Sequence, residues 1–421
     1  MRNFVNDKAL CFGFQIRIII CGVAKRRPLI ERKIVMYRIG KEEKEAVARV
    51  IDSGELFKVN NGSLQETANF EKELKEKFGI DYALLMTSGK AALTSALIGM
   101  GIGPGDEVIV PAYTYMATAV AVLATGAIPV VAEIDETLML DPKDVENKIT
   151  KNTKAIIPVH MMGYPCDMDG IMAVAKKHNL FVLEDSCQAD GGSYKGRRLG
   201  TIGDAGALSF NFYKIISAGE GGALLTNNKE IFEKGLIYHD SSAVAYFGDQ
   251  MSGFSAEPFC GHEFRTNEIT AAIMREQLKR LDTILADLRK VKKSLKDKLS
   301  THFEIIPSND YEGDCGTTLT LMFKTTEQAQ AFVEKAYDVA IPGFMGKHMY
   351  YGWGPILNKR GAAHPRMNPY NMAENANAPE MTADCCPRSK DLLTRSVHIF
   401  LNPDWTEEEI IKRANDYINA L

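Results

Sequence analysis

The sequence has no excess of charge of either sign, no internal repeat and no low-complexity tract. Its 50 Lys and Arg residues against 54 Asp and Glu residues leave a formal net charge of −4 over 421 residues. This near-balance argues against a nucleic-acid-binding protein that works through overall basicity. The hydrophobic fraction of 45% and the charged fraction of 25% are ordinary for a globular protein and exclude disorder of the whole chain. A chain of this length can bury a large core, and it predicts two to three domains, or a large α/β domain with a smaller one.

The cysteines are poorly spaced for a structural role. None of the eight stands at Cys-x-x-Cys spacing, and Cys385 and Cys386 are adjacent, which suits neither a zinc ligand pair nor an ordinary disulfide. The histidines have no second ligand at metal spacing, so we expect no metal site. The sequence therefore predicts a cytoplasmic protein, in a reducing compartment, whose thiols are buried or inert.

An uninterrupted hydrophobic run is also missing. The apolar stretch 9–24 is broken by Gln15 and Arg17 and is followed by three basic residues, 25–27. It is too short and too broken to span a membrane, and it lacks a convincing cleavage site. We expect residues 1–35 to form a loosely attached extension; the alternative is a degenerate export or anchoring segment.

From Gly40 onward, short apolar runs alternate with stretches in which apolar residues recur at helical spacing. This alternation predicts an α/β fold with a mostly parallel central sheet between helices. Functional residues in such sheets lie just beyond the carboxyl ends of the strands. The expected strands are Tyr82–Met86, Glu107–Val110, Ile128–Ala132, Thr153–Pro158, Leu180–Glu184, Gly206–Phe210 and Gly222–Thr226, and the expected helices are Lys41–Asp52, Gln65–Phe78, Lys90–Met100, Tyr115–Thr125, Pro142–Ile149 and Asp169–His178.

The pattern changes near residue 270. The stretch Asn267–Leu299, rich in Lys, Arg and Leu, predicts one or two helices that lead out of a large domain, 36–270. Shorter strands and helices then predict a smaller C-terminal α+β domain, 271–421. Within it, residues 343–382 are rich in Gly, Pro, Asn and aromatics, so we expect a long irregular connection that helps to shape a pocket.

Two glycine-containing segments are similar to phosphate-binding loops. Gly101–Gly105 follows a predicted helix and precedes a predicted strand, the reverse of the dinucleotide-binding order, so we expect an ordinary turn. Ser88-Gly89-Lys90 follows a predicted strand and opens a helix. Backbone N–H groups at such a helix start, together with the helix dipole, bind phosphate. Capping of the helix by Ser88 explains this segment equally well.

Acidic residues end another predicted strand. Glu184 and Asp185 follow an apolar run, and Gln188 stands three residues further on. A carboxylate at the tip of a central strand is costly without a cationic partner. The pattern indicates either a helix N-cap by Asp185 or a carboxylate that pairs with a protonated ring nitrogen.

A lysine follows a third strand. Lys214 stands just after an apolar run and before the glycine-rich segment 219–222. Desolvation at such a position lowers the pKa of the ammonium group and makes the amine nucleophilic, as Schiff-base chemistry requires. Tyr113 and Tyr115 follow the second strand and could stack on a flat ring, although aromatics there are more often core residues. A phosphate cradle, a carboxylate, an aromatic ring and an amine are what a protein contributes to a pyridoxal phosphate site.

Four motifs stand in a fixed order: Ser88-Gly89-x-Ala91-Ala92-Leu93, Gly105-Asp106-Glu107-Val108-Ile109-Val110-Pro111, Glu184-Asp185-x-x-Gln188, and Ser209-Phe210-x-x-x-Lys214 with Gly219-Glu220-Gly221-Gly222. From roughly Met36 to the C-terminus, the chain resembles the DegT/StrS-type sugar aminotransferases, pyridoxal phosphate enzymes of fold type I. The resemblance implies a homodimer whose active sites share residues across the interface. The segments 132–137 and 192–196 are most similar to the branch that aminates an eight-carbon acidic sugar.

The resemblance implies a role for each matched residue. Lys214 would be the catalytic residue that holds pyridoxal phosphate as an internal aldimine and, once released, moves a proton between two carbons. Asp185 would keep the pyridine nitrogen protonated, and Gln188 and Tyr115 would lie against the two faces of the ring. Ser209, with the amides of Gly89 and Lys90, would bind the phosphate. The cofactor-binding residues implied in this way are Ser88, Gly89, Lys90, Tyr115, Asp185, Gln188, Ser209, Lys214 and Glu263.

Two residues depart from the family's pattern. Lys90 stands where the family usually has Thr, and Glu263 stands where it usually has an Asn that reaches the partner subunit's phosphate. A glutamate alone beside a phosphate would be repelled. We therefore hypothesise that Lys90 and Glu263 form an ion pair across the dimer interface.

The resemblance implies transfer of an amino group from glutamate or glutamine to a keto-sugar in polysaccharide or antibiotic biosynthesis. This keto-sugar would be linked to a nucleotide or would be an acidic eight-carbon sugar. Two alternatives stay open, namely a pyridoxal phosphate-dependent dehydration, elimination or cyclisation, and a non-catalytic regulatory homologue. Lys214 argues against both, since the family's dehydratases carry a histidine there and a regulator could lose the lysine. His239 and Arg265 are candidate substrate contacts. We expect neither nucleic-acid nor membrane partners.

Overall fold

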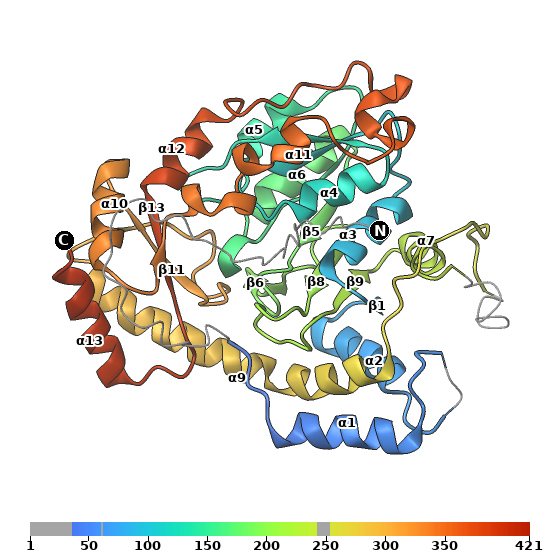
Figure 1. Cartoon of the computed structure of the whole chain (residues 1–421), viewed down its shortest axis with the longest axis horizontal. Helices are drawn as coiled ribbons and strands as arrows, with labels where there is room; N and C mark the ends of the chain where they lie inside the picture. Colours follow the sequence, from blue (N-terminus) through green and yellow to red (C-terminus); the bar gives the residue numbers. More distant parts are fainter. Residues whose placement is uncertain (1–35, 60–61, 242–252) are drawn as a thin grey trace, which may run out of the picture. The chain divides into compact units, whose positions relative to one another are not determined.

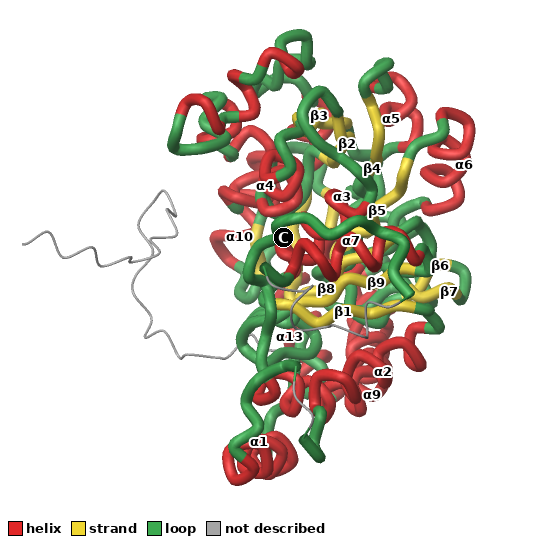
Figure 2. The backbone as a smooth tube through the Cα atoms, turned by 90° about the vertical axis from the view of Figure 1, so that its right-hand side faces the viewer, coloured by secondary structure: helices red, strands yellow, loops and turns green. Residues whose placement is uncertain are grey.

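The computed structural model describes residues 36–59, 62–241 and 253–421. All of them belong to one compact unit, Ile34–Leu421. The expected N-terminal extension, residues 1–35, lies outside the described residues. The described part contains a seven-stranded sheet, a four-stranded sheet and a two-stranded ribbon (Figures 1 and 2).

The seven-stranded sheet forms the centre of the fold. Its strand order is β1-β9-β8-β5-β4-β2-β3. The neighbouring pairs from β8 to β3 are parallel, whereas β9 runs antiparallel to β1 and β8. The predicted α/β fold with a mostly parallel sheet is therefore confirmed, and the seven predicted strands lie within two residues of the observed ones: β1 (Tyr82–Met86), β2 (Glu107–Pro111), β3 (Ile128–Ala132), β4 (Thr153–Ile156), β5 (Phe181–Asp185), β8 (Ala205–Ser209) and β9 (Gly222–Thr226).

Most of the helices around this sheet pack on it through apolar residues, whereas α1 packs on the long helix α9 (Glu268–Leu299). Helix α3 packs on β8 and β9, α2 packs on β1, and α6 packs on β5. Several helices begin at a side chain that accepts a backbone N–H, which fixes the turn out of the preceding strand. The helices are α1 (Lys41–Ser53), α2 (Glu66–Phe78), α3 (Gly89–Gly99), α4 (Ala117–Ala124), α5 (Pro142–Lys148), α6 (Met168–His178) and α7 (Lys229–His239).

A single helix, α9 (Glu268–Leu299), joins this part of the chain to the four-stranded sheet. It packs against α1 and α2 and also against α13, and Figure 1 shows it running between them. No helix within the described ranges is long and apolar enough to cross a membrane. The remaining elements are the ribbon strands β6 (Ser193–Tyr194) and β7 (Arg197–Arg198), the sheet strands β10 (Glu304–Ile305), β11 (Thr318–Met322), β12 (Val339–Ala340) and β13 (Ser396–Phe400), and the helices α10 (Thr326–Lys335), α11 (Gly354–Leu357), α12 (Pro387–Arg395) and α13 (Glu407–Ile418).

The long connection between β12 and α12 is irregular, as its composition predicts. It contains α11 and several single turns of 3-10 helix. Its first part returns to the large sheet, because the N–H of Thr114 donates to the His348 carbonyl (3.0 Å) and the N–H of Met116 donates to the Lys347 carbonyl (2.9 Å). Residues 347–348 are thereby fixed beside the segment that follows β2.

Candidate active site

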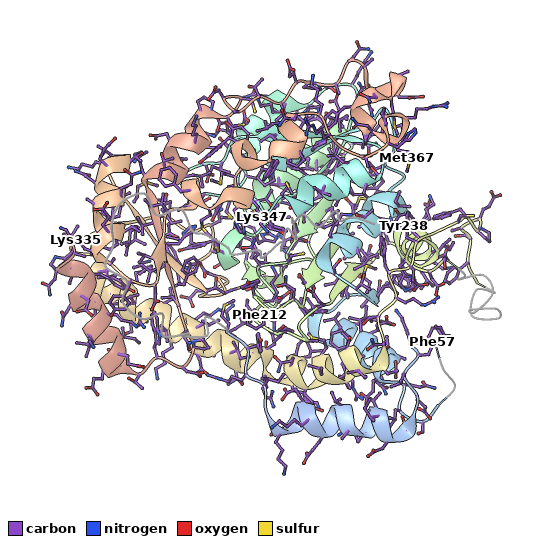
Figure 3. All side chains as sticks on the ribbon, in the orientation of Figure 1. Phe57, Phe212, Tyr238, Lys335, Lys347 and Met367 are labelled. Atoms are coloured by element: carbon purple, nitrogen blue, oxygen red, sulfur yellow. The ribbon has the colours of Figure 1, made fainter. Side chains whose placement is uncertain are left out.

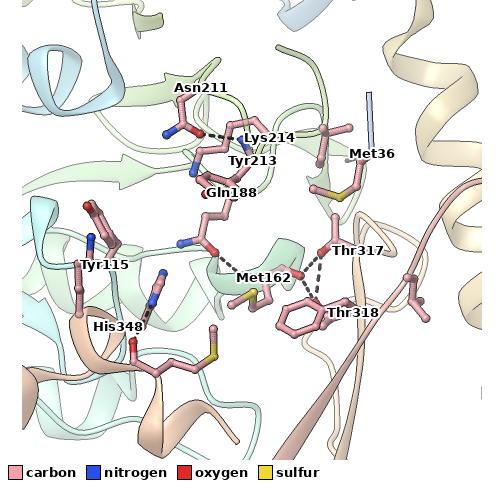
Figure 4. A pocket seen from close by; sticks show the side chains of 15 residues that line it. Met36, Tyr115, Met162, Gln188, Asn211, Tyr213, Lys214, Thr317, Thr318 and His348 are labelled. Carbon is pink, nitrogen blue, oxygen red and sulfur yellow. Dashed lines mark hydrogen bonds between the residues drawn. The ribbon is translucent and has the colours of Figure 1, made fainter. Parts of the chain in front are cut away.

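A cavity of about 420 Å³ lies beyond the carboxyl ends of β2, β5 and β8. Among the residues that line it are Tyr115, Gln188 and Lys214, each from the segment after one of those strands (Figure 4). The start of β11 and the end of β13 contribute Thr318 and Phe400 to the opposite wall. Residues more than a hundred positions apart in the sequence therefore meet where the parallel topology predicts a site.

Lys214 lies in a tight loop after β8. The Asn211 side chain accepts the N–H of Tyr213 (3.0 Å), and the Asn211 carbonyl accepts the N–H of Lys214 (3.1 Å). The N–H of Phe212 donates to the carbonyl of Gly219 (3.0 Å), which closes the loop. These bonds fix the backbone and leave the Lys214 side chain at the cavity next to Gln188 (Figure 4).

Asp185 is the last residue of β5 and is 5% exposed. One carboxylate oxygen accepts the hydroxyl of Thr118 (2.8 Å), and the other accepts the N–H of Cys187 (3.1 Å). No helix begins at Asp185, so the N-cap alternative is wrong. The Asp185 side chain has no ion-pair partner among the residues that the structure describes. A buried carboxylate without a cation fits a ligand that carries a positive charge, such as a protonated pyridine ring.

The start of α3 lies against β8 and β9. Ser88 caps this helix, since its hydroxyl accepts the N–H of Ala91 (3.1 Å). A Cβ atom on Gly89 would lie 2.5 Å from the Cys187 sulfur and 2.9 Å from Cβ of Ser209, and one on Gly222 would lie 2.3 Å from the Ser88 carbonyl carbon. Both glycines are required for this close approach. The helix N-terminus and Ser209 are thus neighbours, which fits a phosphate group.

Glu184, next to Asp185, organises the loop 200–203. Its buried carboxylate accepts the N–H groups of Gly200 (2.9 Å), Ile202 (2.5 Å) and Gly203 (2.8 Å). The ring of His160, also fully buried, lies 3.1 Å away. The two acidic residues that end β5 therefore have different surroundings. Glu184 accepts three backbone N–H groups, whereas Asp185 has no cation beside it.

Replacing Glu184 with alanine is expected to lower the free energy of unfolding by about 3–5 kcal/mol, because three backbone amides and His160 lose their acceptor. The measurement is urea unfolding followed by circular dichroism. Glu45→Ala, at an exposed position on α1, is the matched control and should change stability by less than about 0.5 kcal/mol. Equal effects of the two substitutions would contradict this role for Glu184.

Two candidate substrate contacts do not line the cavity. The His239 ring is fully buried, with Nδ1 2.7 Å from the Leu236 carbonyl and Nε2 3.4 Å from the Lys58 ammonium. Burial and the Lys58 charge lower its pKa well below the ordinary value, so the ring is neutral. Arg265 forms ion pairs with Asp240 (2.6 Å) and Glu263 (2.8 Å). Within one chain, neither residue is placed to touch a ligand in the cavity.

The hypothesised pair of Lys90 and Glu263 is absent within the chain, where Glu263 binds Arg265. Lys90 follows Gly89 on α3 and is half-buried, and this burial lowers the pKa of its ammonium group. A pair across a subunit interface stays a prediction.

A double-mutant cycle tests that pair. Lys90→Thr alone is expected to weaken cofactor retention, and Lys90→Thr with Glu263→Asn should restore it, with a coupling of about 0.5–3 kcal/mol. Retention is measured as the cofactor absorbance left on the protein after gel filtration. Additive effects of the two substitutions would reject the pairing.

Sequence reasoning missed two residues of the irregular connection. The His348 ring centroid lies 5.4 Å from that of Tyr115, and the Lys347 ammonium lies 5.6 Å from the Tyr115 centroid. Burial, with the charges of Lys214 and Lys347, lowers the pKa of His348. Figure 3 labels Lys347 in this connection, which has no periodicity that could have marked either residue.

Asp190, after Gln188, was missed as well. Its side chain is fully buried, and neither carboxylate oxygen has a hydrogen-bond partner among the described residues. Burial raises its pKa well above the ordinary value, against smaller opposing effects of Lys214 and the Ser209 backbone. Burial therefore favours the uncharged acid at Asp190.

Comparison with known proteins identifies the family. The model of the DegT/DnrJ/EryC1/StrS aminotransferase family matches residues 37–413. The chain belongs to this family. The resemblance seen in the sequence is thereby confirmed, together with the expected enzyme class of pyridoxal phosphate-dependent aminotransferases. Solved structures with this fold hold pyridoxamine phosphate or hydrated pyridoxal phosphate.

Relatives within the family act in sugar metabolism. The chain is 41% identical to the spore coat polysaccharide biosynthesis protein SpsC of Bacillus subtilis (strain 168), over 64% of this chain and 68% of that protein. It is 36% identical to the GDP-perosamine synthase of Escherichia coli O157:H7, over 77% of this chain and 86% of that enzyme. The solved structure of S. venezuelae DesV in complex with a ketimine intermediate has 28% identity and a TM-score of 0.71, covering 90% of this chain and 94% of that one.

Proposed function

We propose that this aminotransferase passes an amino group from glutamate or glutamine to a keto-sugar. One observation carries the proposal. The Lys214 amine reaches the cavity that Gln188 and Tyr115 also line, and Asp185, which ends the strand before Gln188, has no cation of its own. An amine beside a site for a cationic ring is what transamination requires.

Several residues of the chain would have separate roles in the reaction. Bound pyridoxal phosphate supplies an aldehyde that condenses with amines and a ring that accepts electrons. Asp185 holds the proton on the pyridine nitrogen, because its carboxylate is buried and kept in place by Thr118 and Cys187. Ser209 and the start of α3 bind the phosphate. The Lys214 amine, which lies at the cavity, would hold the cofactor and would act as the base that moves a proton at the donor's α-carbon.

The charges at the cavity favour an anionic acceptor. The lining residues include the cations Lys214 and Lys347 and no Asp or Glu. Lys347 has no ion-pair partner in the part of the chain that the structure describes. A carboxylate or a diphosphate would be attracted here. We propose as the acceptor an acidic eight-carbon keto-sugar, the substrate of the branch that segments 132–137 and 192–196 resemble, or a nucleotide-linked keto-sugar, as the name of the GDP-perosamine synthase relative suggests.

Absorbance of the holoenzyme tests the proposal. Glutamate or glutamine should convert the bound cofactor from its pyridoxal to its pyridoxamine form, and one keto-sugar of a panel should reverse the change. The panel contains neutral, carboxylate-bearing and nucleotide-linked keto-sugars. Failure of every amino donor to change the spectrum would overturn transamination and favour the dehydration, elimination or cyclisation alternative.

Lys347 offers a sharper test of the acceptor's charge. Lys347→Met is expected to raise KM for an acidic acceptor about five- to tenfold and to leave KM for a neutral one unchanged, because one partly solvated attraction is lost. Lys347→Arg keeps the charge and should stay near wild type. The control is Lys359→Met, whose ammonium pairs with Glu380 outside the cavity lining. Equal changes for neutral and acidic acceptors would contradict the proposal.

We propose further that the enzyme acts in the cytoplasm as a homodimer with shared active sites. Glu263 supports a shared site, since it stands where the family's pattern reaches the partner subunit and it does not line the cavity of its own chain. Light scattering of the purified protein should give twice the 46.6 kDa mass of the chain. A monomer with full activity would overturn this part of the proposal.

A further inference from the structure

Two adjacent thiols lie just before α12, away from the catalytic cavity. The sulfur atoms of Cys385 and Cys386 are 3.9 Å apart. Cys386 is fully buried and its sulfur lies 3.8 Å from the Val131 carbonyl at β3, whereas Cys385 is partly exposed. One thiol is therefore open to reagents from solvent, and the second lies directly behind it.

The surroundings make these two thiols unequal. The hydrogen bond from the Cys386 thiol, helped by a backbone hydrogen bond at Thr382 and by the charge of Lys148, lowers the pKa of Cys385 to about 7. The same bond, together with burial, raises the pKa of Cys386. Cys385, which solvent can reach, is therefore the thiol of the pair that more readily becomes a thiolate, and Cys386 is the one that keeps its proton. Burial raises the pKa of Cys187, the thiol beside Asp185, so that residue stays protonated.

We propose that Cys385 and Cys386 form a peroxide-sensitive dithiol that closes reversibly to a vicinal disulfide. The Cys385 thiolate attacks one oxygen of a hydroperoxide and the O–O bond breaks, which forms a sulfenic acid and a hydroxide (or alkoxide) ion that takes a proton from solvent and leaves as water (or an alcohol). The Cys386 sulfur then attacks the Cys385 sulfur, the S–OH bond breaks, and the Cys386 proton leaves with hydroxide as water. Two thiols are oxidised and one peroxide is reduced.

Adjacency makes such a disulfide easy to reduce. The α-carbons of neighbouring residues are about 3.8 Å apart, whereas ordinary disulfides join α-carbons about 4.4–6.8 Å apart. Closing the bond therefore forces the backbone between Cys385 and Cys386 out of its relaxed geometry. Strained disulfides have higher reduction potentials and are reopened by cellular thiols, which favours a reversible modification over a permanent staple.

Formation of the disulfide would also disturb the wall of the catalytic cavity. The buried Tyr350 hydroxyl accepts the N–H of Cys386 (3.0 Å) and donates to the Ala383 carbonyl (2.9 Å). Tyr350 itself is fixed to the segment after β2, because its N–H donates to the Ala112 carbonyl (3.0 Å). His348, two residues earlier, lines the cavity. Rotation of the Cys386 amide would remove one bond that holds this segment.

Thiol labelling and mass spectrometry test the proposal on the wild-type holoenzyme. At pH 6.5–7 iodoacetamide should modify Cys385 about threefold faster than Cys260, although Cys260 is the more exposed thiol. Brief treatment with hydrogen peroxide should protect Cys385 from labelling and lower the mass of the peptide that contains both residues by two hydrogens. Dithiothreitol should restore both.

Activity gives a second readout. Peroxide should lower kcat/KM of the wild-type enzyme about threefold to tenfold, which is the decrease expected for the loss of one hydrogen bond. Dithiothreitol should reverse this decrease. Cys385→Ser should keep its activity under the same peroxide treatment. Faster labelling of Cys260 than of Cys385, or a peptide that gains oxygen instead of losing two hydrogens, would overturn the proposal. An equal loss of activity in Cys385→Ser would do so as well. The labelling and mass measurements do not depend on the proposed function.

Discussion

Replacing Lys214 with alanine is expected to lower kcat by at least about a thousandfold, the largest effect of any single substitution at this site. The substitution removes the amine that condenses with the cofactor and the base that moves the proton, and general base catalysis alone contributes about 10²–10⁴-fold. The rate is measured as donor-dependent conversion of the bound cofactor. Lys214 has no side-chain hydrogen bond or ion pair within the described residues, so the fold should be unaffected.

Two variants separate loss of chemistry from loss of binding. Lys214→Arg keeps the positive charge at the cavity and should be as inactive as Lys214→Ala, because a guanidinium is a poor nucleophile and base at neutral pH. Lys234→Ala on α7, outside the cavity lining, should behave as wild type. In both inactive variants, borohydride should no longer fix the cofactor to the protein. A trapped adduct that survives in Lys214→Ala would overturn the assignment of the active site.

Replacing Asp185 with asparagine is expected to lower kcat about 10²- to 10³-fold, the range found when one charge-stabilising group is removed from an active site. Asparagine has almost the same shape, but it carries no charge, and its one carbonyl oxygen can accept from Thr118 or from Cys187 and not from both. The proton on the ring nitrogen is then no longer stabilised, and the ring becomes a weaker acceptor of electrons. The measurement is the single-turnover rate with glutamate, with retention of the cofactor as a second readout.

Thr118→Val provides the matched control for Asp185. It removes the hydroxyl that donates to the Asp185 carboxylate at 2.8 Å and leaves the charge in place. The expected loss is about tenfold or less, the value of one hydrogen bond. If Thr118→Val and Asp185→Asn reduced the rate equally, the geometry of Asp185 and not its charge would be the property that matters.

The course of the chain through the large sheet could be predicted closely. The strands of the large sheet and the helices up to α6 follow the apolar runs and helical spacing within one or two residues, since a parallel sheet buried on both faces requires continuous apolar strands. The short ribbon strands β6 and β7 were not predicted. Capping of α3 by Ser88 could also be predicted, because a cap bond spans three residues and depends on local sequence alone. The composition of the connection before α12 predicted that it is irregular, but it did not predict the path that this connection takes.

The site could be predicted only in part. Lys214, Gln188 and Tyr115 meet at one cavity because parallel strands end at the same edge of the sheet. The neighbours of Asp185 could not be predicted, since Thr118 stands 67 residues earlier in a helix that contains no matching motif. His239 was a candidate substrate contact because it lies near a predicted strand end or loop, yet its ring is fully buried and Nδ1 lies 2.7 Å from the Leu236 carbonyl of the same helix.

The sequence by itself determined the family, the order of the four motifs and the residues that could meet a cofactor, because such motifs consist of neighbouring residues whose geometry is local. The tertiary structure alone decided which charges stay without a partner. Asp185 is buried with no cation beside it, and burial favours the neutral form of Asp190. The packing of residues 347–348 against the segment after β2 places the Lys347 charge at the cavity wall. Pairing and burial depend on contacts between residues far apart in the chain, which no local pattern records.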